Sequence, residues 1–334
     1  VKFDQAGRQV RYILQRINQR VFKDVPALMD NIARVTEHAH SRAAEIGGTD
    51  LSRRVLTLVP TREGRTYHRD EAGGCWRCYL FIEGARTYDV VEEPRQAAAG
   101  ARAFGGFQQL LINLPGARLH ETIPFFHHTP SRFDALQRAA AADPHNRAAA
   151  ARSEIAFSLE REGMVDVLLN LQARGEIPEK VTHNDTKLNN VMIDDVTAEG
   201  LCVIDLDTVM PGLALYDFGD MVRTGTNSTA EDDPDPGRVH ARMPFFEALV
   251  EGYLGTARSF LTPAEIAHLA FAGRLITFEI GIRFLADYLD GDVYFKTRRP
   301  DHNLDRARNQ FALVRDMEVK QGEMEKIVKK HAAS

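Results

Sequence analysis

Cysteine and tryptophan are scarce in this chain of 334 residues, which contains three cysteines and one tryptophan. Three cysteines cannot all form pairs, so a scaffold held together by disulfides is excluded. The sequence also lacks an uninterrupted apolar run of membrane-spanning length and a secretory signal pattern. We therefore expect a cytoplasmic protein with no membrane partner.

An excess of positive charge is absent as well. The 42 lysines and arginines are outnumbered by 47 aspartates and glutamates, which gives a net charge of −5 and a pI of about 6.2. No global positive field attracts a nucleic acid or an anionic membrane, so neither is expected as a partner. A chain of this length forms one large domain or two joined ones. The expectation is a monomer that acts on a small molecule.

The pair Cys75 and Cys78 does not indicate a metal or redox site. The two residues lie three positions apart in an apolar, strand-like run. Residues at that spacing on a strand point to opposite faces. The two thiols should therefore diverge.

The segment from His183 to Asn190 has the spacing H-x-D-x-x-x-x-N. This spacing is typical of a kinase catalytic loop, in which the aspartate accepts the proton of the substrate hydroxyl and the asparagine binds a metal ion. Asp185 is therefore the candidate catalytic base and Asn190 a candidate metal ligand. His183 is expected to brace the loop.

Two short apolar runs follow, at residues 191–193 and 201–204, with turn-forming residues between them. The pattern predicts a β-hairpin, whose second strand returns Asp205 toward Asn190. Carboxylate and amide oxygens suit Mg²⁺, so Asp205 is the second candidate metal ligand, and ATP and Mg²⁺ are the expected cofactors. Asp207 is a candidate for supporting the metal or the substrate.

The sequence also contains Asp217-Phe218-Gly219, the letters of the metal-binding motif of protein kinases. The metal-binding aspartate must end the hairpin strand beside the catalytic loop. Asp205 has that position, whereas Asp217 comes after a further turn and another apolar stretch. We expect Asp217 to cap a helix or to brace the catalytic loop.

At these residues the chain resembles the superfamily of aminoglycoside phosphotransferases and choline kinases, in which an I-D-x-[DE] strand follows the catalytic loop. Four strings resemble the N-acetylhexosamine 1-kinases more specifically: YILQRIN at residues 12–18, VTHNDTK at 181–187, VIDLDTVMPG at 203–212 and FLADYL at 284–289. The resemblance extends over nearly the whole chain. It implies an α+β, two-lobe fold similar to that of protein kinases.

The resemblance also implies how the chain is organised. Residues 1–84 are expected to form a small, β-rich lobe that binds the nucleotide, and residues 85–334 a larger, mainly helical lobe that binds the acceptor. The implied reaction is transfer of the γ-phosphoryl group of ATP to the anomeric hydroxyl of N-acetylglucosamine or N-acetylgalactosamine. Arg283 and Tyr294 are expected near the sugar.

The segments expected to bind the nucleotide depart from the usual kinase motifs. The strand at residues 77–82 should run into the hinge between the lobes, where backbone groups of Phe81, Ile82 and Glu83 would meet adenine. No Val-Ala-Ile-Lys is present, so Arg16 is the candidate cation for the phosphates and Gln15 the alternative, because neighbours on a strand face opposite sides.

Glu37 is placed by the sequence on a helix of the small lobe, where it either pairs with that cation or is a solvated charge. A glycine-rich phosphate loop is absent from the sequence. The chain begins at Val1, and the expectation is that a longer N-terminus is missing.

Arg283 lies in a late apolar helix, with Glu279 and Asp287 four positions before and after it. It is either a surface ion pair or an arginine that two carboxylates hold toward a sugar. His120, His127 and His128 lie near Phe125 and Phe126. This cluster is read as core, with a wall of the sugar pocket as the alternative.

Two classes of acceptor are disfavoured. No dense acidic cage indicates a polycationic aminoglycoside, and one tryptophan makes an aromatic box for choline less favoured. The alternatives kept open are another small-molecule hydroxyl kinase and a pseudokinase that binds nucleotide without turnover. The intact set of Asp185, Asn190 and Asp205 argues against the pseudokinase.

Overall fold

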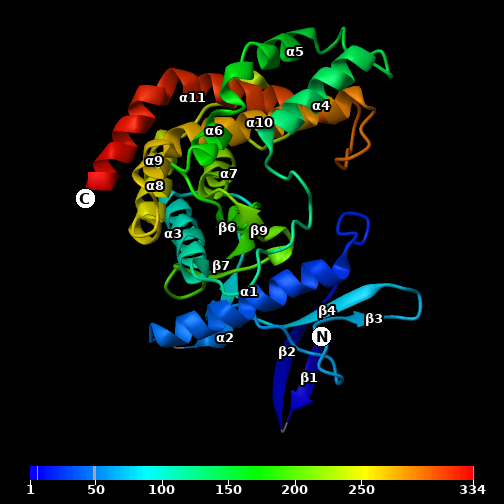
Figure 1. Cartoon of the computed structure of the whole chain (residues 1–334), viewed down its shortest axis with the longest axis vertical. Coiled ribbons are helices and arrows are strands. Elements are labelled where there is room, and N and C mark those ends of the chain that lie inside the picture. The colour runs from blue at the N-terminus through cyan, green and yellow to red at the C-terminus, as the bar shows by residue number, and fades with distance from the viewer. Residues whose placement is uncertain (6, 48–49, 334) are drawn as a thin grey trace.

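The computed structural model describes residues 1–5, 7–47 and 50–333. The chain forms a small β-rich lobe and a larger helical lobe (Figure 1). The elements of the small lobe are β1 (Lys2–Gln5), β2 (Arg8–Arg16), β3 (His68–Arg69), β4 (Cys75–Leu80), α1 (Val25–Glu45) and α2 (Leu51–Arg54). The small lobe has an antiparallel four-stranded sheet with the strand order β1-β2-β4-β3, and two helices lie between β2 and β3 in the sequence.

The start of α1 follows the signal that the sequence provides. Asp24 caps the helix by accepting a hydrogen bond from the N–H of Ala27 at 3.0 Å, and Pro26 occupies the first turn. The helix buries a stripe that includes Leu28, Ile32 and Val35. Because this stripe repeats at helical spacing, α1 joins the core along one face only.

Strand β4 alternates between a buried and a half-buried face. Cys75 is buried and Cys78 is half-buried, and both are free thiols on opposite faces, as expected. The register pairs Gln15 of β2 with Arg77 of β4, so these two side chains share one face of the sheet, on which Arg77 is buried and Gln15 is exposed. That face points toward the large lobe, because Arg77 contacts Asp207 there.

The large lobe begins with β5 (Ala85–Arg86), which pairs with β7 (Val191–Asp194), and β7 pairs with β8 (Gly200–Val203). The predicted hairpin is thus confirmed, with Val191 opposite Val203. A second small sheet joins β6 (Lys180–Thr182) to β9 (Met210–Gly212). Single turns at η2 (Leu188–Asn190) and η3 (Leu206–Thr208) lie between these strands.

Helices make up the rest of this lobe. They are α3 (Pro94–Leu111), α4 (Thr129–Ala142), α5 (Arg152–Leu159), η1 (Glu162–Met164), α6 (Val167–Ala173), α7 (Ala214–Thr226), η4 (Pro236–Arg238), α8 (Met243–Ala257), α9 (Pro263–Ala267), α10 (Leu269–Leu289) and α11 (His302–Ala333). A capping box formed by Thr262 and Glu265 opens α9. Helix α10 is apolar on nearly all sides, since it packs against α4, α7 and α11.

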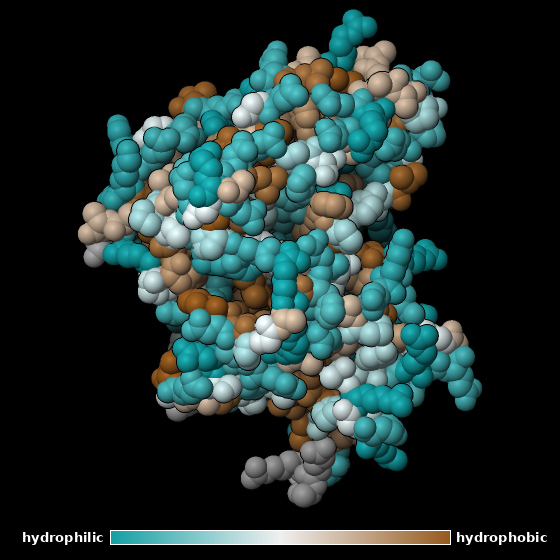
Figure 2. All heavy atoms as spheres, in the orientation of Figure 1, coloured by the Kyte–Doolittle hydropathy of each residue, from teal (hydrophilic) through white to brown (hydrophobic). Residues whose placement is uncertain are grey.

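The two lobes meet where α1 crosses α3 and the β7–β8 hairpin. The amide of Asn31 on α1 donates to the carbonyls of His120 and Val209 of the large lobe, at 2.8 and 3.1 Å. Beside this contact, α1, α2, α3 and β8 enclose a largely apolar cavity of about 230 Å³, and Figure 2 shows hydrophobic atoms in a hollow at this level. None of the described helices is long and apolar enough to cross a membrane.

Candidate active site

The catalytic loop between β6 and η2 is held from beneath by α7. The carboxylate of Asp217, in the first turn of α7, accepts the N–H groups of His183 at 2.9 Å and Asn184 at 2.7 Å, and the amide of Gln108 at 2.7 Å. Burial raises the pKa of Asp217, although these donors oppose the shift. Asp217 is fully buried and braces the loop.

His183 fixes the loop to the hairpin, as the sequence suggested. It is buried, and its Nε2 lies 2.9 Å from the carbonyl oxygen of Ile204, directly before Asp205. Its own carbonyl accepts the hydroxyl of Thr208 at 2.7 Å. The positions of the catalytic loop and of the strand end are thereby linked.

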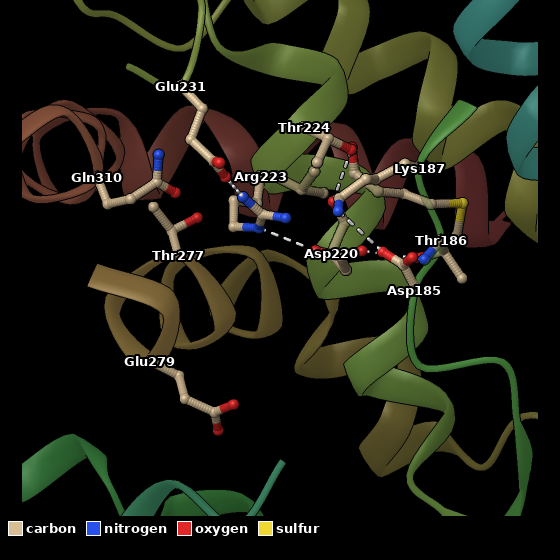
Figure 3. Close-up of polar contacts among 12 residues, drawn as sticks. Asp185, Thr186, Lys187, Asp220, Arg223, Thr224, Glu231, Thr277, Glu279 and Gln310 are labelled. Carbon is tan, nitrogen blue, oxygen red and sulfur yellow. Dashed lines mark hydrogen bonds and ion pairs between the residues drawn. The ribbon is translucent and has the colours of Figure 1, made fainter. Parts of the chain in front are cut away.

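Asp185 is held at both carboxylate oxygens. Lys187 Nζ lies 3.1 Å from Oδ1, and the amide of Asn190 donates to Oδ2 at 3.2 Å and to the backbone carbonyl of Asp185 at 2.8 Å. Burial would lower the pKa of Lys187, but the negative charges of Asp185, Asp220 and Glu231 together outweigh it and raise the pKa above its ordinary value. Figure 3 shows Lys187 reaching Asp185, a contact that the sequence reasoning did not predict.

Asp205 lies next to this group. Ile204 donates its N–H to the carbonyl oxygen of Asn190 at 2.9 Å, so the hairpin brings the two predicted metal ligands together. Asp205 adopts a left-handed backbone conformation (φ 59°) at the start of η3. Burial, followed by the negative charges of Asp207 and Asp185, raises the pKa of Asp205.

The cluster around Asn190 and Asp205 suits a divalent cation that takes some of its ligands from the protein and the others from phosphates and water. Within the described residues, no group of three or more His, Cys, Asp or Glu side chains is arranged to bind a metal. Mg²⁺ is commonly bound by one or two protein oxygens together with substrate phosphates and waters. The oxygens of Asn190 and Asp205 match that donor set, and a cation there would offset the crowded carboxylates.

The nucleotide side corrects the placement expected for Arg16. Arg16 pairs in register with Trp76 on the other face of the sheet, close to Asp70. Gln15 faces the lobe junction, but it carries no charge. The cation at this position is Arg77, whose guanidinium contacts both Gln15 and Asp207.

The sequence did not reveal Arg77, because its position depends on the register between β2 and β4. Glu37 is exposed on α1, as expected for a solvated charge. No ion pair joins it to the sheet in the described part of the chain.

The predicted hinge follows β4 directly. The N–H of Phe81 donates to the carbonyl of Arg11 at 3.0 Å, and the guanidinium of Arg11 stacks 3.8 Å from the centre of the Phe81 ring. The carbonyl of Glu83 accepts Nε of Arg53 at 2.8 Å, while Ile82 between these residues is buried. Arg53 also reaches Asp194 of β7 at 2.8 Å and so joins the hinge to the large lobe.

A cavity of about 330 Å³ opens at Asp185 on the side of the large lobe. Arg283 and Tyr294 also line it, so the structure brings the predicted acceptor residues to the aspartate predicted to be the catalytic base. Arg283 lies between the rings of Phe126 and Phe295, 5.3 and 5.7 Å from their centres. Tyr294 is 60% exposed and stands at the rim.

Only one of the two carboxylates expected around Arg283 is near it. Glu279 Oε1 lies 4.0 Å from its guanidinium. Asp287 instead accepts the N–H groups of Val293, Tyr294 and Phe295, at 3.0, 2.7 and 3.0 Å. The carboxylate therefore shapes the loop that presents Tyr294, because three consecutive backbone donors converge on it.

The three histidines of the cluster have separate roles. His120 lies near Asp30 at the surface, and His128 caps α4. His127 is buried: Nδ1 is 2.8 Å from Glu279, and Nε2 is 3.2 Å from the carbonyl oxygen of Asn184. His127 is thus a satisfied core residue that also lines the cavity. The interpretation of the cluster as core is wrong for His120, which is exposed.

Another buried group lies behind the catalytic loop. Arg223 of α7 pairs with Asp220 at 2.8 Å and with Glu231, and Asp220 accepts the N–H of Thr186 at 2.9 Å. Figure 3 shows Arg223 between the two carboxylates. The sequence reasoning assigned no chemistry to Glu231. The only available signal was the spacing of Asp220 and Arg223, three apart on a helix.

Comparison with known proteins agrees with this geometry. Residues 1–260 match the family model described as "Phosphotransferase enzyme family". The match covers more than half of the chain, so the chain belongs to this phosphotransferase family.

Several solved structures share the fold. An aminoglycoside phosphotransferase from Alicyclobacillus acidocaldarius is 13% identical with a TM-score of 0.61, covering 99% of this chain and 92% of its own. A choline/ethanolamine kinase family protein from Mesorhizobium loti is 16% identical with a TM-score of 0.54, covering 100% and 92%. An amicoumacin kinase in complex with AMP-PNP, Ca²⁺ and Ami is 13% identical with a TM-score of 0.56, covering 96% of this chain and 84% of its own. At these identities the likeness shows the fold alone.

Proposed function

We propose that the protein transfers the γ-phosphoryl group of ATP to the anomeric hydroxyl of an N-acetylhexosamine. The observation that carries the proposal is the shared cavity, in which Asp185 faces the same space as Arg283 and Tyr294. The catalytic base and the acceptor residues are thereby close enough to act on one small molecule. The strings shared with the N-acetylhexosamine 1-kinases supply the identity of the acceptor.

In this mechanism Asp185 accepts the proton of the anomeric hydroxyl while the hydroxyl oxygen bonds to the γ-phosphorus. The bond from that phosphorus to the β,γ-bridging oxygen breaks, and ADP leaves. Asn190 and Asp205 would hold Mg²⁺, which when bound neutralises charge on the phosphates. Lys187 fixes Oδ1 of Asp185, and the second oxygen is held by Asn190.

The acceptor side favours a neutral sugar over an amine. The cavity is lined by five cationic side chains and three acidic ones, which are Lys187, Arg223, Arg283, Lys296 and Arg306 against Asp185, Asp220 and Glu231. Choline, ethanolamine or an aminoglycoside would bring further positive charge into this space, which like-charge repulsion opposes. Arginine donors are well suited to hydroxyl and carbonyl oxygens.

The nucleotide is expected at the lobe junction, with adenine at Phe81, Ile82 and Glu83. The amicoumacin kinase of the same fold was solved with AMP-PNP and Ca²⁺, which supports a nucleotide and a divalent cation here. Asp207 would support the site indirectly, because it already pairs with Arg77.

A substrate panel tests the proposal. ADP formation with Mg²⁺ and ATP is measured for N-acetylglucosamine, N-acetylgalactosamine, glucosamine, choline and ethanolamine. We expect kcat/KM for the N-acetyl sugars to exceed that for the amines by at least about tenfold. Faster turnover of an amine would favour another hydroxyl kinase, and no ADP from any acceptor would favour a pseudokinase.

A further inference from the structure

The buried guanidinium of Arg77 stands at the junction of the lobes. Its side chain is 1% exposed, although it belongs to a strand of the small lobe. Nη1 contacts the carboxylate of Asp207, and Nε and Nη2 lie 3.0 and 2.8 Å from the amide oxygen of Gln15. Three of its five N–H donors are thus used within the protein, and two are left for another acceptor.

Gln15 and Arg77 form a directly opposed pair across β2 and β4. Their side chains share one face of the sheet, whereas Arg16 lies on the other. At this cross-strand position the positive charge therefore comes from Arg77 on β4, because its partner on β2 is the uncharged Gln15. The amide of Gln15 accepts two N–H groups of the guanidinium, so it orients Arg77 without adding charge.

The surroundings keep this group charged. Burial would lower the pKa of Arg77, but neighbouring Tyr79 and the carboxylates of Asp207 and Asp205 outweigh burial and raise it. Asp205 is the predicted metal ligand, so Arg77 stands beside the place where phosphates and cation would meet. An arginine guanidinium binds phosphate well, because it can donate two parallel N–H groups to the phosphate oxygens.

We propose that Arg77 supplies the positive charge that faces the nucleotide phosphates and that Gln15 positions its guanidinium, so that a cross-strand pair replaces a lysine on β2. The inference rests on the proposed ATP-dependent function. It assigns Asp207 the role of counter-ion to Arg77.

Relocating the charge tests this proposal. Binding of AMP-PNP with Mg²⁺ is measured by calorimetry, without sugar, for the intact protein and for Arg77→Met. We expect the variant to bind about 10- to 100-fold more weakly, the range for losing a hydrogen bond to a charged group. Adding Gln15→Lys to Arg77→Met should recover most of the affinity, because the new ammonium starts from the position directly opposite residue 77.

Two further variants exclude a purely structural effect. The double variant Arg77→Met, Asp207→Asn removes both charges of the buried ion pair. It should therefore fold even if the single variant is destabilised by the unpaired carboxylate of Asp207. It should still bind AMP-PNP weakly. Arg16→Met, on the opposite face, should bind within about twofold of the unmodified protein.

The proposal is overturned if the folded Arg77→Met, Asp207→Asn protein binds AMP-PNP normally. It also fails if Gln15→Lys gives no recovery in a folded protein, or if Arg16→Met loses more affinity than Arg77→Met. An unmodified protein that binds no AMP-PNP would overturn the proposed function itself, and this inference with it. The sugar panel is independent of these outcomes, so a wrong acceptor does not affect them.

Discussion

At the scale of single residues, Asp185 is held by a cation at one carboxylate oxygen and by an amide at the other. Such clamping fixes the direction in which a base accepts a proton, and misplacement by a fraction of an ångström lowers the rate. The surrounding contacts to Asp217 and His183 supply the rigidity. The site therefore depends on residues that do not themselves touch the acceptor.

Asp185→Asn should lower kcat by about 10²- to 10⁴-fold, because the amide cannot accept the hydroxyl proton. Sugar binding should change little, since the cavity keeps its shape. Steady-state kinetics together with sugar titration would check both parts. A variant with near-normal kcat would remove Asp185 from the mechanism.

The raised pKa of Asp205 predicts how the requirement for Mg²⁺ depends on pH. Its folded-state pKa is raised above the ordinary value, so the folded protein holds this proton more tightly than the unfolded chain does. A proton competes with the cation for the same oxygens. The concentration of Mg²⁺ needed for half-maximal rate should therefore rise as pH falls toward and through the raised pKa, and fall as pH increases.

Titrating Mg²⁺ at a series of pH values measures this dependence. In Asp205→Asn the turnover supported by Mg²⁺ should be lost, whereas Asp217→Asn should mainly lower thermal stability. A stronger Mg²⁺ dependence in Asp217→Asn would reverse the assignment of the metal strand.

At the scale of elements, α7 organises the catalytic loop with two carboxylates one turn apart. Asp217 accepts the N–H groups of His183 and Asn184, and Asp220 accepts that of Thr186. Three loop amides are thereby satisfied by one helix, so the loop holds its shape without regular structure of its own.

Asp287 likewise accepts backbone N–H groups and fixes the segment that follows α10. Asp287→Ala would leave the N–H groups of Val293, Tyr294 and Phe295 without their acceptor, which should cost about 2–4 kcal/mol of stability. It should also raise KM for the sugar more than KM for ATP, because Tyr294 loses its placement. Urea unfolding and steady-state kinetics measure the two effects, and equal changes in both KM values would contradict the local role.

The elements differ in how far the sequence could predict them. The hairpin, the cap of α1 and the capping box of α9 follow from short-range patterns, and the catalytic loop from the spacing of Asp185 and Asn190. Arg77 could not be found this way, because its role depends on the register of two strands about sixty residues apart. The partners of Asp287 and Glu231 likewise depend on loop paths that carry no periodic signal.

At the scale of the whole molecule, the two lobes contribute different halves of one site. The small lobe and the hinge supply Arg77 and the backbone near Ile82, and the large lobe supplies Asp185, the proposed metal ligands and the proposed acceptor cavity. Arg53 and Asn31 cross between the lobes. Chemistry at the junction thus depends on how the lobes are held together.

The central claim is that phosphate is transferred to the anomeric oxygen. An anomeric hydroxyl is more acidic than an ordinary alcohol, so a carboxylate such as Asp185 can take its proton as the phosphoryl group moves. The decisive measurement is to incubate the protein with ATP, Mg²⁺ and N-acetylglucosamine or N-acetylgalactosamine, alongside the 1-deoxy analogue of each, and to locate the phosphate by phosphorus–proton NMR coupling. The predicted result is an N-acetylhexosamine 1-phosphate with no turnover of the 1-deoxy sugars, whereas phosphate at C6 or equal turnover of the 1-deoxy sugars would contradict it.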